Sequence, residues 1–230
     1  FSLLFIIPYF HYFAYRMNSQ ISHMIFYTEY DTLIIYQKKG GNGMQKAIFS
    51  RVDLTSDNDL LAKEFVSCIQ DLIEVDDVQE LKAFSQHMDT SRFQHSLNVS
   101  YYSFLFARKF RLDTYSIARA GLLHDLYFYD WRTKNNRPME GRHCAIHPLI
   151  ALENAKKTCT INPVIEDAIV HHMWPMTLHM PKTKEGWLLQ AVDKYCALSE
   201  IILQGSRKVR YSRAAVSFLT ICSFATQIWK

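Results

Sequence analysis

The residues best suited to chemistry are the adjacent pair His124 and Asp125, which follow the small and apolar run Gly121–Leu123. This run predicts a buried helix, and a neutral imidazole next to a carboxylate is costly in an apolar interior unless both find partners. A divalent cation would satisfy both side chains. The alternative is that His124 hydrogen-bonds within the core while Asp125 faces solvent, and these two residues alone leave both interpretations open.

A histidine upstream of this pair is expected to face the same interior. His95 shares a helical stripe with Val99, Tyr102 and Phe106, which predicts that its ring points inward. A lone histidine on such a stripe is more often a hydrogen-bonded core residue than a metal ligand. Both interpretations therefore stay open at this position.

The next histidine, His147, comes directly before Pro148. Because proline favours the first position of a helix, we expect His147 to cap a helix over 149–157. A side chain at a cap projects from the helix start and is free to bind a metal. His143, four residues earlier, is expected in the preceding loop, either supporting the site or at the surface.

Two consecutive histidines, His171 and His172, end the helix that we expect to begin after Asn162. Adjacent imidazoles at a helix end are difficult to explain by packing, so we interpret them as ligands, with exposed surface histidines as the alternative. Asp193 is expected in the middle of a later helix, beside apolar residues. A carboxylate in that position needs a cationic partner.

Two basic residues near these positions could bind phosphate. Lys194 follows Asp193, and Arg142 lies in the loop before His147. Negative charge that develops on a phosphate group is stabilised by such cations. Position alone makes them candidates, and the alternative is that each is a surface residue.

His87, near the end of an earlier short helical segment, is expected to be exposed.

The composition favours one helical domain. The 230 residues include only 7 Gly and 6 Pro, and 49% are hydrophobic, which is enough for a full core. Lys and Arg are scattered and the net charge is only +4, so the sequence shows no nucleic-acid patch. The five cysteines are odd in number and lack CxxC spacing. This argues against a disulfide framework or a thiolate zinc site and favours a reducing, cytoplasmic compartment.

The first 43 residues differ from the rest. Residues 1–15 are apolar and aromatic but too short to span a bilayer comfortably, so a truncated hydrophobic anchor is one interpretation. Residues 38–44 (KKGGNGM) correspond to a purine-rich run just before an ATG, which is typical of a bacterial ribosome-binding site. We therefore predict that residues 1–43 are upstream sequence and that 44–230 form the domain, with no membrane segment of its own.

Apolar residues recur at helical spacing through most of the remaining chain. Capping residues and prolines mark the expected boundaries. Residues 126–142 contain turn formers and little periodicity, so we expect a loop over the site. The predicted helices cover 57–72, 90–110, 114–125, 149–157, 163–172, 184–203 and 212–229.

The order of these side chains resembles the HD-domain superfamily of metal-dependent phosphohydrolases, over approximately residues 90–200. The simple family pattern of H, HD and D corresponds to His95, His124 with Asp125, and Asp193. The additional histidines resemble the binuclear branch, to which the cyclic-dinucleotide phosphodiesterases belong. The resemblance implies an all-α fold, a single HD-type helical bundle.

The chain departs from that branch at two places. Leu126 and Tyr127 stand where the HD-GYP phosphodiesterases carry Ile-Gly, and residues 173–175 read Met-Trp-Pro instead of Gly-Tyr-Pro. Cyclic di-GMP is therefore not the expected substrate.

The resemblance also implies a ligand set. Imidazole and carboxylate together suit one or two divalent ions such as Mn, Fe, Zn or Co, whereas an all-oxygen site favours Mg or Ca. Asp125 would bridge the two ions. By resemblance, the first ion would be held by His95, His124, Asp125 and Asp193, and the second by Asp125, His147, His171 and His172.

The function implied is hydrolysis of a phosphate ester in a small substrate, with a nucleotide as the expected class. The nucleophile would be a hydroxide that the metal activates, so no Ser or Cys is required. The alternative is a non-catalytic HD-type module that binds a nucleotide or a partner. Divergent modules of that kind usually lose ligands, whereas this chain retains all seven candidates.

Overall fold

The computed structural model describes residues 59–204 except 88 and 134–136, together with the single residues 47, 50, 54 and 217. The chain divides into two compact units, Phe1–Asn42 and Gly43–Lys230, and all described residues lie in the second. The segment interpreted as upstream sequence lies outside the described residues, as does the helix predicted over 212–229 apart from residue 217. Both stay predictions.

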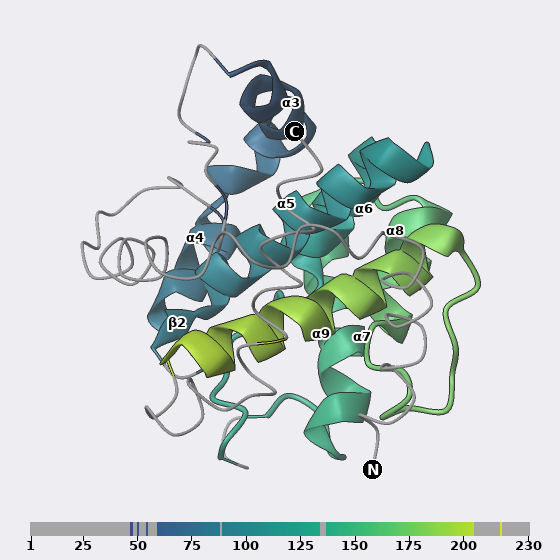
Figure 1. Ribbon diagram of the computed structural model, residues 1–230. Helices are drawn as coiled ribbons and strands as arrows, with labels where there is room; N and C mark the ends of the chain where they lie inside the picture. Colours follow the sequence, from purple (N-terminus) through teal and green to yellow (C-terminus); the bar gives the residue numbers. More distant parts are fainter. Residues whose placement is uncertain are drawn as a thin grey trace. The chain divides into compact units, whose positions relative to one another are not determined.

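The described residues form a helical bundle with one small sheet, which confirms the all-α fold class (Figure 1). Strands β1 (Ser85–His87) and β2 (Thr90–Ser91) pair antiparallel. No helix within the described ranges is both long and apolar enough to cross a membrane. The helices are α3 (Leu60–Ile73), α4 (Asp76–Glu80), the 3₁₀ turn η2 (Leu81–Ala83), α5 (Arg92–Phe110), α6 (Thr114–Leu123), α7 (His143–Thr158), α8 (Pro163–His171) and α9 (Lys184–Gln204).

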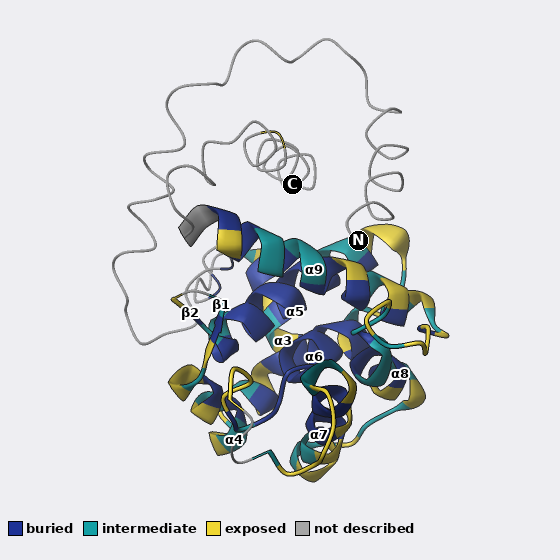
Figure 2. Ribbon diagram, turned by 90° about the horizontal axis from the view of Figure 1, so that it is seen from below, coloured by how far each residue is buried: buried dark blue, intermediate teal, exposed yellow. Residues whose placement is uncertain are grey.

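Helix α5 is the centre of the bundle. It packs against α6 and α9, and Phe65 of α3 contacts its Tyr101 and Phe104 rings. Figure 2 shows α5 buried along most of its length. A helix that is buried on nearly all sides belongs to the interior of a domain. The small side chains of Ser96, Ser100 and Ser103 are fully buried on it and allow neighbouring helices to approach closely.

In the site region, α5 and α6 begin close to the predicted residues, and a side chain caps each start. Ser91 accepts a hydrogen bond from the Gln94 N–H (3.2 Å) at the start of α5, and Asp113 accepts one from the Ser116 N–H (2.9 Å) at the start of α6. Farther from the site, α3 begins only at Leu60, later than predicted.

A close approach between α5 and α6 positions the catalytic candidates. A Cβ added to Gly121 would lie 2.6 Å from the Ser100 Cα and 2.8 Å from its nitrogen. Only glycine therefore fits at this contact. Because His124 caps α6 only three residues after Gly121, the contact brings His124 next to the His95 ring, with a centroid separation of 5.4 Å.

The predicted start of α7 is wrong. His147 does not cap the helix: α7 begins at His143, and Pro148 lies inside it as the sixth residue. The Arg142 carbonyl accepts hydrogen bonds from the next turn, at 2.9 and 3.2 Å, without a side-chain cap. A proline this near the start removes only one helical hydrogen bond, and packing of the first turn outweighs that cost. His143 is consequently helical and does not lie in a loop.

Candidate metal centre

Six of the seven predicted ligands converge in the interior of the bundle. They come from five segments that are far apart in the sequence, and each is buried. The six are His95 on α5, His124 and Asp125 directly after α6, His147 on α7, His172 directly after α8, and Asp193 on α9.

One half of the centre is formed around Asp193. Its Oδ1 lies 3.1 Å from the Nε2 of His95 and 3.7 Å from the Nε2 of His124. These three residues form one of the groups whose ligand atoms are close enough to share an ion. They correspond to the simple H, HD and D pattern expected from the sequence.

The other half is formed around Asp125. Its Oδ1 lies 3.2 Å from the Nε2 of His147 and 3.8 Å from the Nε2 of His172. Its second oxygen, Oδ2, lies 3.6 Å from the Nε2 of His124. The carboxylate of Asp125 therefore stands between the two halves, as a bridging ligand would.

Hydrogen bonds to the backbone fix three of the imidazole rings. Each Nδ1 faces a carbonyl of the preceding helical turn: His124 to Gly121 (2.9 Å), His147 to His143 (2.9 Å) and His172 to Ile169 (2.7 Å). The Nδ1 atoms carry a proton in these bonds, so in the neutral form of each ring the Nε2 atom presents a lone pair. The Nε2 atoms of His147 and His172 nevertheless lie only 2.9 Å apart. Two facing lone pairs at this distance are satisfied by a proton shared between the rings or by a metal ion that both rings bind.

Unpaired polar atoms point to the same conclusion. Within the described part of the chain, His124 Nε2 and Asp125 Oδ1 are buried and lack a hydrogen-bond partner. Leaving such atoms unsatisfied is costly in a low-dielectric interior. The residues present therefore fit a divalent ion, which would take up both atoms.

The charges of the centre also fit a divalent cation. Burial would raise the pKa of Asp125, but the neighbouring His124 and His147 hold it well below its usual range. Burial likewise opposes ionisation of Asp193, and Lys194 outweighs it, so its pKa is also well below the usual value. Burial, reinforced by His147, lowers the pKa of His172 to about 3. Burial opposes the charged form of His95 and His124, but the neighbouring carboxylates outweigh it and raise the pKa of both rings, so each would release a proton on binding a metal. Ionised carboxylates together with imidazoles form a donor set for borderline transition metals.

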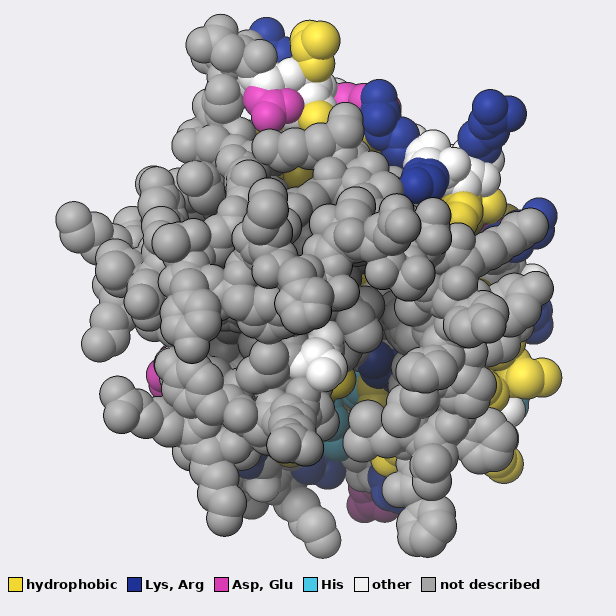
Figure 3. All heavy atoms as spheres, viewed as in Figure 1, with side chains coloured by type: hydrophobic (Ala, Val, Ile, Leu, Met, Phe, Trp, Pro, Cys, Tyr) yellow, Lys and Arg dark blue, Asp and Glu magenta, His cyan; other side chains and the backbone are white. Residues whose placement is uncertain are grey.

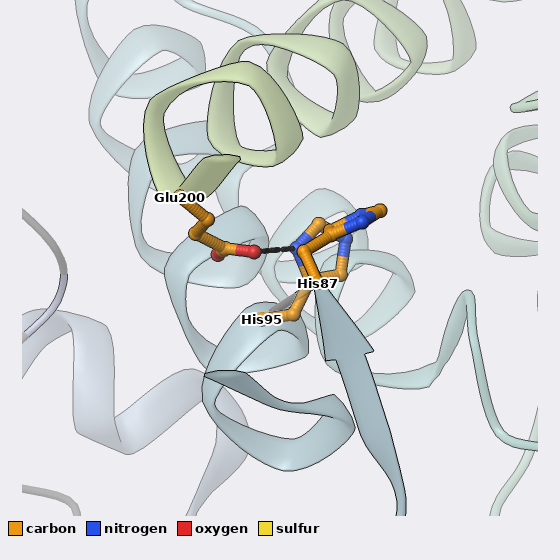
Figure 4. Close-up of side chains that lie close together, drawn as sticks. All are labelled: His87, His95 and Glu200. Atoms are coloured by element: carbon orange, nitrogen blue, oxygen red, sulfur yellow. Dashed lines mark hydrogen bonds and ion pairs between the residues drawn. The ribbon is translucent and has the colours of Figure 1, made fainter. Parts of the chain in front are cut away.

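Glu200 is a site residue that sequence analysis missed. Figure 4 shows it reaching from α9 to the His95 ring, where its oxygens lie 3.0 and 3.2 Å from Nδ1. The amide of Asn98 donates to the same carboxylate (2.8 Å). With Nδ1 bound to Glu200, the Nε2 of His95 is directed at Asp193. Glu200 lies seven residues after Asp193 on the same face of α9, and this spacing was the available signal.

The expectation that His87 is exposed is wrong. Strand β1 carries it into the bundle, where it is half-buried and its ring centroid lies 5.1 Å from that of His95 (Figure 4). The ligand atoms of His87, His95 and Glu200 form a further close group. Burial lowers the pKa of His87, and the adjacent His95 lowers it further.

The structure places His171 apart from the other six ligands. Its Nδ1 lies 2.8 Å from the Asp167 Oδ1, and Asp167 also accepts hydrogen bonds from the backbone of Lys182 and Thr183. None of the close groups among the described residues contains His171 or His147, but His147 lies 3.2 Å from the Asp125 Oδ1, whereas the carboxylate that His171 contacts is that of Asp167. Its role as a ligand stays a prediction.

The two predicted cations differ in position. The Lys194 Nζ donates to the His172 carbonyl (2.7 Å) and lies 3.4 Å from the Asp193 Oδ2, at the edge of the centre. Arg142 is exposed at the start of α7, next to His143.

In the space-filling view, histidine side chains are visible from the surface of the molecule (Figure 3).

Comparison with known families agrees with this geometry. A family model described as the HD domain matches residues 92–198, the stretch that runs from the start of α5 into α9 and includes all the predicted ligands. Neither a curated protein nor a solved structure matched the chain. The match and the buried His/Asp groups confirm the resemblance noted in the sequence, and residues 92–198 of this chain form an HD domain.

Proposed function

We propose that the chain is a metal-dependent phosphohydrolase that cleaves a phosphate ester of a nucleotide. The observation that carries this proposal is the facing pair of imidazole Nε2 atoms, His147 and His172, 2.9 Å apart beside the ionised Asp125. Buried imidazole nitrogens that converge on buried carboxylates are suited to binding a metal ion, which would replace the protons that these groups otherwise share.

The proposed ligands are the six converging residues, with His171 as a seventh candidate. One or two divalent ions of the Mn, Fe, Zn or Co class would supply the activation of water and neutralise charge on the phosphate. Asp125 lies between the two halves of the centre and would contribute a ligand to each half. Glu200 fixes the ring of His95 through Nδ1, so that its Nε2 is presented to the ion.

Lys194 is the proposed contact to the substrate phosphate. Its ammonium group has three donors, and the bond to the His172 carbonyl uses one of them while fixing its position at the edge of the centre. A cation held there can stabilise negative charge that develops on the phosphate oxygens. Arg142, exposed at the start of α7, is the second candidate.

Stacked aromatic rings support a nucleotide as substrate. The His143 ring lies nearly parallel to that of His147, with centroids 4.4 Å apart, and Trp131 stacks on His143 at 6.0 Å. Trp131 is 36% exposed, so this row of rings connects the centre with the surface. An exposed aromatic face can stack on a nucleobase whose phosphate is bound at the centre.

Metal analysis combined with a phosphate-release screen tests the proposal. The protein is stripped with a chelator, reloaded with Mn²⁺ and assayed on nucleotides and on ribose 5-phosphate, which lacks a base. We expect bound metal, turnover and a preference for nucleotides. H124A should lose both metal and turnover, whereas H179A, an exposed histidine, should retain them.

Two outcomes would contradict the proposal in different ways. Protein that binds no metal would refute the metal centre. Bound metal without turnover of any nucleotide or simple ester would favour a nucleotide-binding module instead of an enzyme.

A further inference from the structure

A buried glutamine contacts the central carboxylate of the proposed metal site. The Gln86 side-chain amide donates to the Asp125 Oδ2 at 2.5 Å. Gln86 lies on β1, outside the HD match and thirty-nine positions before Asp125 in the chain. Gln86 is the buried residue of the strand, between the exposed Ser85 and the half-buried His87.

The orientation of this amide is determined by its other end. Arg92 Nε donates to the Gln86 Oε1 (2.9 Å), and the Tyr127 hydroxyl donates to the same oxygen (3.3 Å). A group that receives two donors must be the carbonyl oxygen and not the NH₂ group. The NH₂ group of Gln86 is therefore directed at Asp125.

Arg92 is itself held rigidly. It is fully buried, its guanidinium donates to the carbonyls of Tyr127 and Tyr129, and it stacks on the Tyr127 ring at 3.5 Å. A guanidinium has no acceptor and cannot reverse its role. Arg92 thus connects Tyr127 and Tyr129 with Gln86. Because Arg92 can only donate, the Gln86 amide must turn its oxygen towards it.

The contact distinguishes the two oxygens of Asp125. Oδ2 carries the bond from Gln86, whereas Oδ1 has no hydrogen-bond donor among the described residues and faces His147 (3.2 Å). Without Gln86 the carboxylate could rotate about its last bond, and either oxygen could turn away from the imidazoles. One hydrogen bond therefore fixes the plane of the carboxylate.

We propose that Gln86 is a positioning residue for the metal centre: it holds Asp125 by Oδ2 so that Oδ1 is presented to the ion, and Arg92 sets the direction of its amide. This inference rests on the proposed function, because it requires that Asp125 binds a metal. Groups that orient metal ligands commonly contribute tenfold to a hundredfold in metal affinity.

Substitution of Gln86 by methionine tests the inference. Q86M preserves the length of the side chain and removes all three hydrogen bonds of the amide. We expect Mn²⁺ affinity, measured by titration calorimetry on chelator-treated protein, to fall about tenfold to a hundredfold. In Co²⁺-loaded protein, the visible absorption bands should shift, because they report the arrangement of the ligands. The matched control is Q79M, which removes a half-buried glutamine that donates to the Ile73 carbonyl on a different helix.

The possible results separate this inference from the function it rests on. Wild-type protein that binds no Mn²⁺ or Co²⁺ would refute the metal centre itself. Wild-type binding together with unchanged affinity and spectrum in Q86M would refute only the role of Gln86. Equal losses in Q86M and Q79M would also refute it, because the effect would then be general destabilisation.

A second variant covers the case in which Q86M does not fold. Y127F retains the ring that stacks on Arg92 and removes one of the two donors to the Gln86 oxygen. We expect a smaller loss of Mn²⁺ affinity, about threefold, in proportion to one neutral hydrogen bond. An affinity equal to that of the wild type would then overturn the proposal.

Discussion

Three histidines of this centre are oriented by backbone carbonyls of their own helices. Each of His124, His147 and His172 donates from Nδ1 to a carbonyl three or four residues earlier. Such carbonyls are available in the last turn of a helix because they lack an intrahelical partner there. For His124 and His172 the side chain both completes the helix end and presents Nε2 to the interior, so no additional residue is needed to set the tautomer.

His172 makes the stability of the metal-free protein depend on pH. Its pKa is lowered to about 3 in the folded state, by burial and then by His147 and His124. An unfolded histidine titrates near its ordinary value of about 6.5, so between these two values the unfolded chain binds a proton that the folded one does not. Stability from His172 is therefore present above about pH 6.5 and lost as the pH falls. From about pH 7 to pH 5, its loss is about 2 kcal/mol.

Urea unfolding of chelator-treated protein at these two pH values measures the effect. The matched variant is H172Q, which cannot take up a proton. We expect the free energy of unfolding to decrease more in the wild type than in H172Q over this interval. Equal decreases would show that His172 titrates normally in the folded protein.

At the level of the elements, the contact between α5 and α6 determines the geometry of the centre. These two helices carry His95 and lead into His124, and they approach most closely where Gly121 lies against Ser100. The atom that a larger residue would meet is backbone, which cannot move aside as a flexible side chain can. The helices must separate if Gly121 is replaced.

G121A tests this dependence. An added methyl group would lie 2.6 Å from the Ser100 Cα, so we expect a loss of about 1–3 kcal/mol in the free energy of unfolding, as for other overpacked cores. Chemical denaturation is the measurement. E153A, at an exposed position of α7, is the control and should change stability by less than about 0.5 kcal/mol. A G121A protein as stable as the wild type would contradict the close packing.

The sequence predicted the elements that depend on local signals. The helix starts near residues 90 and 114, and the stripe that turns His95 inward, are determined within a few residues of where they lie. The helical spacing and the ordered His and Asp residues were sufficient for the fold class and for the HD-domain resemblance.

The remaining features depend on partners that are distant in the sequence. A buried arginine such as Arg92 is rare and is stable only because carbonyls and an aromatic ring surround it. Gln86 has no role without Arg92 and Asp125. Helix α7 begins at His143, five residues before Pro148, and His143 makes aromatic contacts with Tyr127 and Trp131. We attribute the early start to these contacts, although a proline usually lies in the first position of a helix. None of these partners could be assigned from periodicity or capping.

For the molecule as a whole, the centre connects segments from five parts of the chain. His95 and Asp193 are ninety-eight positions apart, and Asp125 and His147 belong to separate segments around them. In the unfolded chain these donors are dispersed, so a metal binds the folded state almost exclusively. Metal binding is therefore expected to stabilise the entire bundle and not only the site.

Thermal unfolding with and without metal tests this coupling. At a free Mn²⁺ concentration of about one hundred times the dissociation constant, we expect about 2.7 kcal/mol of additional stability and a higher Tm. D125N keeps the shape of the side chain but removes the charge between the two halves, so its Tm should respond much less. Mg²⁺, a hard cation that prefers oxygen ligands, should raise the Tm of the wild type less than Mn²⁺ because most donors here are imidazoles. An equal response of D125N and wild type to Mn²⁺ would show that the ion binds elsewhere on the protein.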